Sequence, residues 1–215
     1  MTIAAAAPTV RIGAGKVALE GELEIPARAP GVVLFSHGSG SGRHSPRNQY
    51  VAAELRRAGL GTLLLDLLTP DEDRDAALRF DIDLLTERLS HAVRFLRGHA
   101  AARELPIGLF RASTGAASAL RVAAGMPESV RAVVLRGGRP DLTGDQLLAA
   151  VAAPTLLLVG GADLGVIELN QRAVHRLTGC VRELVLVRGA THLFEEPGTL
   201  EEVARLAAAW FGRYL

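Results

Sequence analysis

The chain alternates short apolar runs with longer amphipathic segments, and this pattern limits what it can fold into. Six runs have strand length and are apolar almost throughout; they lie at residues 31–35, 61–65, 105–110, 130–135, 154–159 and 181–187. Strands that are continuously apolar are typical of a sheet covered on both faces. The pattern therefore predicts a mostly parallel sheet packed between layers of helices.

The segments between these runs have apolar residues at spacings of three and four, as helices do. They lie at residues 48–58, 81–97, 113–124, 144–150, 167–177 and 199–215. Strands that alternate with helices indicate an α/β fold with helices on both faces of the sheet. Before the first run, residues 10–12 and 17–25 flank a Gly-Ala-Gly turn, which predicts an antiparallel hairpin at the sheet edge. With 215 residues and no recognisable linker, we expect a single domain over residues 1–215.

Composition excludes several classes of function. Lys and Arg total 24 against 23 Asp and Glu, and a net charge of +1 does not favour nucleic acid or an anionic membrane as a partner. No segment approaches the roughly 18 apolar residues of a membrane span. The only cysteine, Cys180, can form neither an intrachain disulfide nor a zinc site alone. We expect a cytoplasmic protein without a metal site, and the sequence does not indicate its oligomeric state.

Three residues with complementary chemistry follow three of the predicted strands. They appear in the order Ser113, Asp163 and His192. The carboxyl ends of parallel strands meet at one edge of a sheet, so these side chains are expected to lie close together. A serine hydroxyl becomes a nucleophile when an imidazole takes its proton, and a carboxylate orients that imidazole. The sequence thus predicts a Ser-His-Asp triad, with Asp66 as a second candidate for its acid.

The glycine-rich segment at residues 36–42 follows the first predicted strand. An oxyanion intermediate needs converging backbone N–H donors, usually one from this loop and one from the residue after the nucleophile. We predict the N–H groups of Ser39 and Thr114 for this purpose. The segment lacks the Lys-Ser/Thr of a phosphate-binding P-loop and the G-x-G-x-x-G spacing of a dinucleotide-binding turn.

Five segments together resemble the dienelactone-hydrolase-like branch of the α/β-hydrolase superfamily. They are SHGSGSGRHSPRN (36–48), LFRASTGAA (109–117), RGGRPDL (136–142), PTLLLVGGAD (154–163) and GATHLFEEPG (189–198). The resemblance implies an α/β-hydrolase fold without a cap domain, with Ser113 as nucleophile, Asp163 as acid and His192 as base. It also implies cleavage of a small carboxylic ester or lactone through an acyl-serine, without a cofactor. Dienelactone hydrolases proper have a cysteine at the nucleophile position, where this chain has Ser113.

One residue departs from the pattern, because Arg111 stands two positions before the nucleophile, where glycine is usual. A guanidinium beside a buried strand must find partners or reach solvent, and the sequence leaves open whether Arg111 hinders or serves the site. It therefore also leaves open a non-catalytic protein that binds a ligand or partner, and an acyltransferase that uses the same triad.

Basic residues follow two of the predicted strands and are candidates for substrate binding. Arg43 and His44, with Arg47 nearby, follow the glycine-rich segment, and Arg136 and Arg139 follow residues 130–135. If the two groups border one cleft, their guanidinium groups would favour a substrate that bears a carboxylate.

Overall fold

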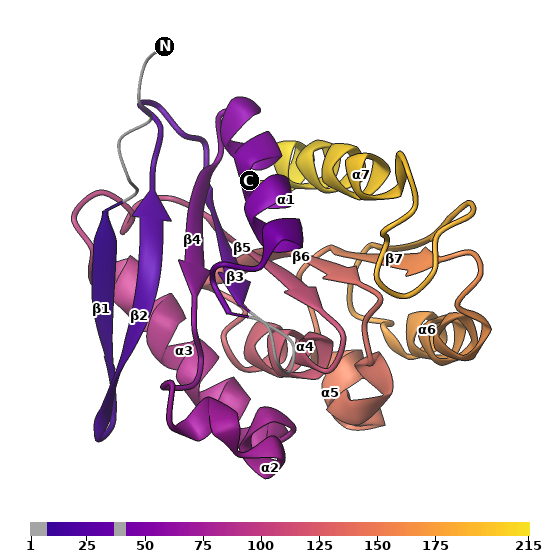
Figure 1. Cartoon of the computed structure of the whole chain (residues 1–215), viewed down its shortest axis with the longest axis horizontal. Coiled ribbons are helices and arrows are strands. Elements are labelled where there is room, and N and C mark those ends of the chain that lie inside the picture. Colours follow the sequence, from indigo (N-terminus) through magenta and orange to yellow (C-terminus); the bar gives the residue numbers. More distant parts are fainter. Residues whose placement is uncertain (1–7, 37–41) are drawn as a thin grey trace.

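The computed structural model describes residues 8–36 and 42–215, which form one eight-stranded sheet. The strand order is β1-β2-β4-β3-β5-β6-β7-β8. The strands, shown in Figure 1, are β1 (Thr9–Ala14), β2 (Val17–Glu24), β3 (Val32–Ser36), β4 (Gly61–Leu65), β5 (Ile107–Ala112), β6 (Val130–Arg136), β7 (Thr155–Gly160) and β8 (Arg182–Val187).

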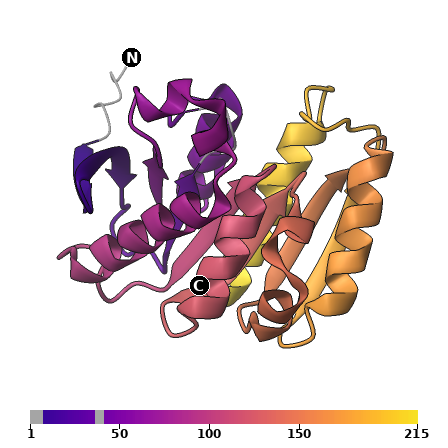
Figure 2. The same ribbon diagram turned by 90° about the horizontal axis from the view of Figure 1, so that it is seen from below.

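Helices cover both faces of this sheet. The α-helices are α1 (Pro46–Arg57), α2 (Ala76–Arg79), α3 (Ile82–Gly98), α4 (Gly115–Gly125), α5 (Asp145–Ala150), α6 (Leu164–Arg176) and α7 (Thr199–Tyr214), and the 3₁₀ turns are η1 (Glu72–Arg74) and η2 (Pro140–Thr143). Helices α1 and α7 pack together on one face, and α3, α4, α5 and α6 form the layer on the other (Figures 1 and 2).

The pairing of the strands confirms the predicted mixed sheet. β1 and β2 form an antiparallel hairpin, and β2 joins the sheet through an antiparallel pairing with β4. All pairings from β4 through β8 are parallel. The carboxyl ends of β3, β5, β6, β7 and β8 therefore share one edge, and the residues that follow them lie there.

Alternation along each strand divides the core into two apolar layers. Leu109 in β5 points to the layer of α3 and α4, while Phe110 points to the layer of α1 and α7. Gly108 allows α7 to approach, because a Cβ there would lie 2.5 Å from the Phe211 ring. Leu109 in one layer and Phe211 in the other are both completely buried.

The structure differs from the sequence predictions in the connections. Residues 67–79, which show no apolar periodicity, contain η1 and α2, and Asp75 caps α2 by accepting a hydrogen bond from the Ala77 N–H at 2.8 Å. α4 begins at Gly115 instead of residue 113, because Ser113 has a backbone conformation that a helix cannot include. Only η2 and α5 lie between β6 and β7, so no cap domain is inserted there. Within the described residues, no helix is both long and apolar enough to cross a bilayer.

Candidate active site

Ser113 occupies the turn between β5 and α4. Its φ of 51° is left-handed, a conformation that is costly for a residue with a Cβ and is found where surrounding structure enforces it. Here the Ser113 N–H donates to the carbonyl of Arg136 at 3.3 Å, and the Ser113 carbonyl accepts from the N–H of Arg139 at 3.0 Å. The turn following β6 therefore holds the serine at the carboxyl edge of the sheet.

Asp163 and His192 form a direct pair at the ends of β7 and β8. The distance between His192 Nδ1 and Asp163 Oδ2 is 2.7 Å, and the aspartate side chain is 17% exposed against 41% for the histidine. Asp163 directly precedes α6, but its carboxylate makes no cap hydrogen bond to that helix. Because the carboxylate accepts a hydrogen bond from the Nδ1–H of His192, it favours the tautomer in which Nε2 is free to act as a base.

The loop that carries His192 is fixed by its neighbours. A Cβ at Gly160 would lie 2.5 Å from the carbonyl oxygens of Ala190 and Thr191, so this close crossing requires glycine. Thr191 Oγ1 donates to Glu196 Oε1 at 2.6 Å, and the Thr191 N–H donates to the other oxygen at 3.1 Å. These hydrogen bonds hold the pKa of Glu196 below its usual value. Glu196 carries no motif by which the sequence marks it, because its hydrogen bonds to Thr191 depend on the fold of this loop.

The turn after β6 brings Ser113 and His192 to the same place. A Cβ at Gly137 would lie 3.4 Å from both Nδ1 and Cε1 of His192, and Gly137 follows Arg136, whose carbonyl binds the Ser113 N–H. The residue that lies beside the imidazole, Gly137, thus directly follows the residue whose carbonyl holds the serine. Within the described residues, Ser113 and His192 make no direct hydrogen bond, a contact that often tightens only when substrate binds.

Thr114 and Ser39 are the residues predicted for the oxyanion site. Thr114 directly precedes α4 and is 7% exposed, so its backbone lies where the partial positive charge of the helix N-terminus is concentrated. Ser39 lies outside the described residues.

Arg111 does not reach solvent. Its side chain is completely buried, and it donates from Nε to the Gly115 carbonyl at 3.1 Å and from Nη2 to Ser118 Oγ at 3.0 Å. Nη1 has no hydrogen-bond partner within residues 8–36 and 42–215. Burial lowers the pKa of Arg111 to about 9. The expectation that Arg111 needs partners is met by an amide carbonyl and a hydroxyl instead of a carboxylate.

Two of the predicted substrate-binding residues, Arg43 and His44, lie beside acidic residues of the protein. Arg43 binds Asp66 and also Glu20 of the hairpin, the latter at 2.8 Å. His44 is exposed, with Nδ1 3.6 Å from a carboxylate oxygen of Glu22 in the same hairpin. These two residues thus contact the hairpin strand β2, and their contact with substrate stays a prediction.

Arg139 and Arg136 lie after β6 but have different surroundings. Arg139 forms a two-pronged ion pair with Asp141, at 2.9 and 2.8 Å. Arg136 is 8% exposed and lies over the ring of Phe194, with Cζ 5.9 Å from the ring centroid. Arg136 is thus placed against the loop that carries His192, and Arg47 contacts the same loop by donating from Nη1 to Glu195 Oε1 at 3.0 Å.

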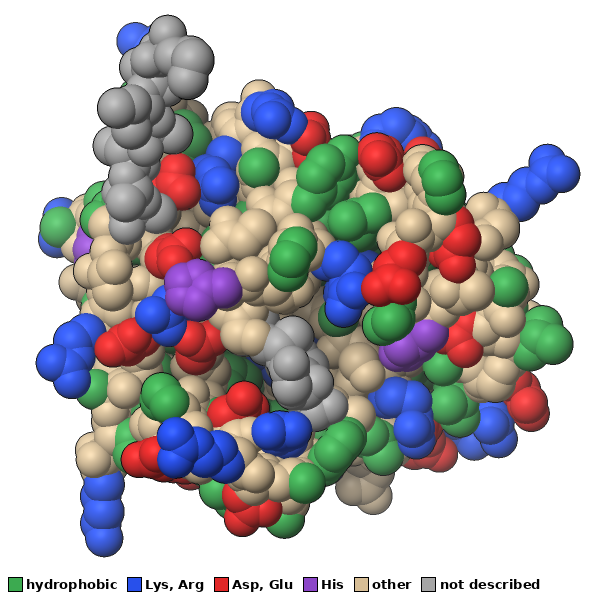
Figure 3. Space-filling model, viewed as in Figure 1, with side chains coloured by type: hydrophobic (Ala, Val, Ile, Leu, Met, Phe, Trp, Pro, Cys, Tyr) green, Lys and Arg blue, Asp and Glu red, His purple; other side chains and the backbone are tan. Residues whose placement is uncertain are grey.

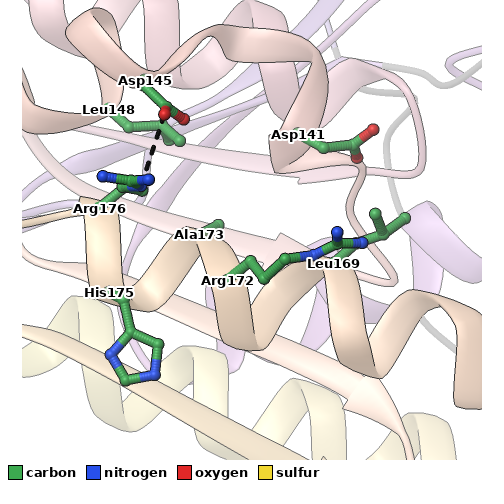
Figure 4. A pocket seen from close by; sticks show the side chains of 8 residues that line it. All are labelled: Asp141, Asp145, Leu148, Leu169, Arg172, Ala173, His175 and Arg176. Atoms are coloured by element: carbon green, nitrogen blue, oxygen red, sulfur yellow. Dashed lines mark ion pairs between the residues drawn. The ribbon is translucent and has the colours of Figure 1, made fainter.

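The surface away from Ser113, Asp163 and His192 carries mixed charge and a groove between α5 and α6. Basic and acidic side chains are interspersed over the face in Figure 3. A groove of about 610 Å³ lies between α5 and α6, where Arg176 pairs with Asp145 at 3.4 Å (Figure 4). None of Ser113, Asp163 and His192 lines it. In the part of the chain that the structure describes, no three His, Cys, Asp or Glu side chains are grouped to hold a metal ion.

Solved structures of other proteins share this architecture. The crystal structure of a dienelactone hydrolase from Anabaena variabilis superimposes with a TM-score of 0.94 and 51% sequence identity, covering 97% of this chain and 98% of the other. The chain belongs to the dienelactone hydrolase family. This family membership confirms the resemblance and the α/β-hydrolase fold. Est1E from Butyrivibrio proteoclasticus, at TM-score 0.80 and 15% identity over 95% of this chain and 98% of its own, shares the fold.

Two other relatives of this chain carry a different name. Proteins from two strains of Mycobacterium tuberculosis are 55% identical over 202 residues, which is 94% of this chain, and they are provisionally named phosphoribosyl transferases. The chain spans 45% of the length of these relatives. No family model matches the sequence.

Proposed function

We propose that the protein is a serine hydrolase that cleaves a small carboxylic ester or lactone. The observation that carries the proposal is the His192–Asp163 pair, 2.7 Å apart, beside the turn that holds Ser113. A pair of this kind orients an imidazole as a base, and a serine held in a strained turn between strand and helix presents its hydroxyl at the edge of the sheet. Membership of a hydrolase family supports the same reaction type.

In the proposed mechanism, Ser113 Oγ attacks the carbonyl carbon while His192 Nε2 takes the hydroxyl proton. Asp163 holds the ring and stabilises the imidazolium. The N–H groups of Thr114 and Ser39 donate to the oxyanion, which collapses as the carbon–oxygen bond to the leaving group breaks and His192 returns the proton to that oxygen. A water molecule, deprotonated by His192, then releases the acid from the acyl-serine.

The name of the Mycobacterium tuberculosis relatives does not favour phosphoribosyl transfer for this chain. Those proteins are more than twice as long as the region they share with it, so the name describes a larger protein. This chain, which contains the shared region, has the fold of a dienelactone hydrolase. We therefore propose ester hydrolysis here.

A fluorophosphonate probe tests the nucleophile. The folded protein should gain the mass of one phosphonyl group on Ser113, and Ser113→Ala should not be labelled. The same variant should lose short p-nitrophenyl ester hydrolysis by at least about 10³-fold, because the serine forms the covalent bond. Absence of labelling, or equal ester hydrolysis by the variant, would favour the non-catalytic binding protein instead.

A further inference from the structure

Arg111 carries a buried charge that no acid of the described chain neutralises. Its side chain is completely buried, and no carboxylate within residues 8–36 and 42–215 pairs with it. Its contacts are instead the Gly115 carbonyl and Ser118 Oγ, both in the first turns of α4. Burial of an ion without a counter-ion is costly, and in a low dielectric such a charge acts strongly on the polar groups that it contacts.

Both contacts of Arg111 lead to one acceptor, the Gly115 carbonyl oxygen. Nε donates to this oxygen directly, at 3.1 Å. Nη2 donates to Ser118 Oγ at 3.0 Å, and Ser118 Oγ donates in turn to the same oxygen at 2.8 Å. One guanidinium therefore polarises this carbonyl by two routes.

Hydrogen bonds carry the polarisation from Gly115 back to Thr114. The Gly115 carbonyl and the Ala116 N–H belong to one peptide group, whose resonance makes the N–H a stronger donor when the oxygen binds a cation. The Ala116 N–H donates to the Ser113 carbonyl at 3.1 Å. That carbonyl shares its peptide group with the Thr114 N–H, the donor predicted for the oxyanion. We call this route, from the guanidinium to the Thr114 N–H, the peptide relay.

The other donor to the Ser113 carbonyl does not bring an uncompensated charge. The Arg139 N–H donates to this carbonyl at 3.0 Å. The Arg139 guanidinium, however, pairs with both oxygens of Asp141, at 2.9 and 2.8 Å. Of the two arginines linked to the Ser113 carbonyl by these bonds, Arg111 is therefore the one whose charge stands without a counter-ion.

We propose that Arg111 is a positioning residue whose charge, carried by the peptide relay, strengthens the Thr114 N–H as a donor to the oxyanion. The inference rests on the proposed serine hydrolase function. Arg111 is out of reach of substrate, since it is completely buried beneath α4. The oxyanion exists in the tetrahedral species and not in the bound ester, so the effect belongs to kcat and not to KM.

Variants of Arg111 test the relay by kinetics. Arg111→Met should lower kcat for a short p-nitrophenyl ester about tenfold, less than the loss of a whole oxyanion donor, while KM stays within about twofold. Arg111→Lys keeps the charge and should recover most of this loss. Ser118→Ala removes one of the two routes and should lower kcat less than Arg111→Met does. If Arg111→Met does not fold, Arg111→Gly takes its place with the same expectation, because glycine is usual at this position.

Leu109→Ala is the matched structural control. Leu109 is completely buried and lies two residues before Arg111 on the same strand, so the variant should lose stability and keep its kcat. Equal falls of kcat in Arg111→Met and Leu109→Ala would overturn the relay. A fall in Arg111→Met that is confined to KM, or an Arg111→Lys protein no more active than Arg111→Met, would overturn it as well.

A boronic acid separates the relay from the proposed function. Ser113 Oγ should bond to the boron of n-butylboronic acid while His192 takes the serine proton, which gives a tetrahedral anion with an oxygen in the oxyanion site. Calorimetry should show a dissociation constant about tenfold higher in Arg111→Met than in Leu109→Ala. Equal constants, in a protein that hydrolyses esters, would overturn the relay alone.

The amide proton of Thr114 tests the relay without catalysis. Its NMR signal should move upfield in Arg111→Met by more than in Leu109→Ala, because the N–H loses the polarisation that the guanidinium supplies. Equal movement in the two variants would overturn the relay. If the natural chain neither binds the boronic acid nor hydrolyses any ester while the Thr114 signal moves as expected, the hydrolase proposal falls and the polarisation of this N–H stands.

Discussion

Arg111 and Gly115 depend on each other beneath the nucleophile turn. The guanidinium lies against the first residue of α4, and a Cβ at Gly115 would lie 2.6 Å from Nη2 and 2.7 Å from Nε. Gly115 thus leaves the space into which the buried arginine fits. The same contact explains why a large side chain is tolerated two residues before Ser113, since the strand directs it under α4 and away from the carboxyl edge.

This dependence predicts a change of sign in a double-mutant cycle. Gly115→Ala should destabilise the natural chain by about 1 to 3 kcal/mol, because the hydrogen-bonded guanidinium must move in a packed interior. In the Arg111→Met background the same substitution should be neutral or stabilise by up to about 1 kcal/mol, as alanine favours the helix. Urea unfolding of the four proteins measures the coupling. The same loss in both backgrounds would contradict it.

At the scale of elements, an ion pair fastens the connection between β4 and α3. Arg88 of α3 is 7% exposed and donates from Nη2 to Glu72 Oε1 at 2.9 Å, while the Thr69 N–H donates to Glu72 Oε2 at 2.9 Å. Burial alone would raise the pKa of Glu72, but the hydrogen bonds from Arg88 and Thr69 outweigh it and hold the pKa below its usual value. The carboxylate therefore stabilises the folded state when it is ionised.

The sign of this pKa shift fixes a pH dependence of stability. Because the folded-state pKa of Glu72 is lowered, its contribution is present above the unfolded value of about 4.3 and is lost as the pH falls through that value and below. Glu72→Gln should lower the free energy of unfolding by about 1 kcal/mol at pH 7 and flatten its fall between roughly pH 5 and 3. Glu168→Gln, an exposed carboxylate on α6, is the control. Parallel curves for Glu72→Gln and the natural chain would contradict the prediction.

The elements that could be located from the sequence are those with a strong apolar pattern, either a continuous run in a strand or a helical period. Buried strands such as β4 were placed correctly, because both faces of the sheet demand apolar residues. The positions of Ser113, Asp163 and His192 could be predicted to converge because they follow parallel strands. The partners of Arg43 could not, since they come from β2 and from Asp66 after β4, and the sequence does not fix how that hairpin pairs with the sheet.

At the scale of the whole molecule, one sheet separates two apolar layers that have no side chains in common. Leu89 of α3 is buried in one layer, and Trp210 of α7 belongs to the other. Neighbouring residues of every central strand serve both layers, as Leu109 and Phe110 do in β5. Loss of packing in one layer should therefore release the strands that support the other. The two layers are then expected to unfold together, as one domain does.

This coupling can be tested with the only tryptophan of the chain. Leu89→Ala should lower the free energy of unfolding by about 2 to 5 kcal/mol, the cost of a cavity in a buried layer. Because the layers unfold together, the urea midpoint from Trp210 fluorescence should move as far as the midpoint from far-UV circular dichroism, although Trp210 lies across the sheet. Leu164→Ala, on a side chain that is 76% exposed, should move neither. If the fluorescence midpoint stayed in place while the dichroism midpoint fell, the two layers would be separate units of unfolding, and the chain would not act as one domain.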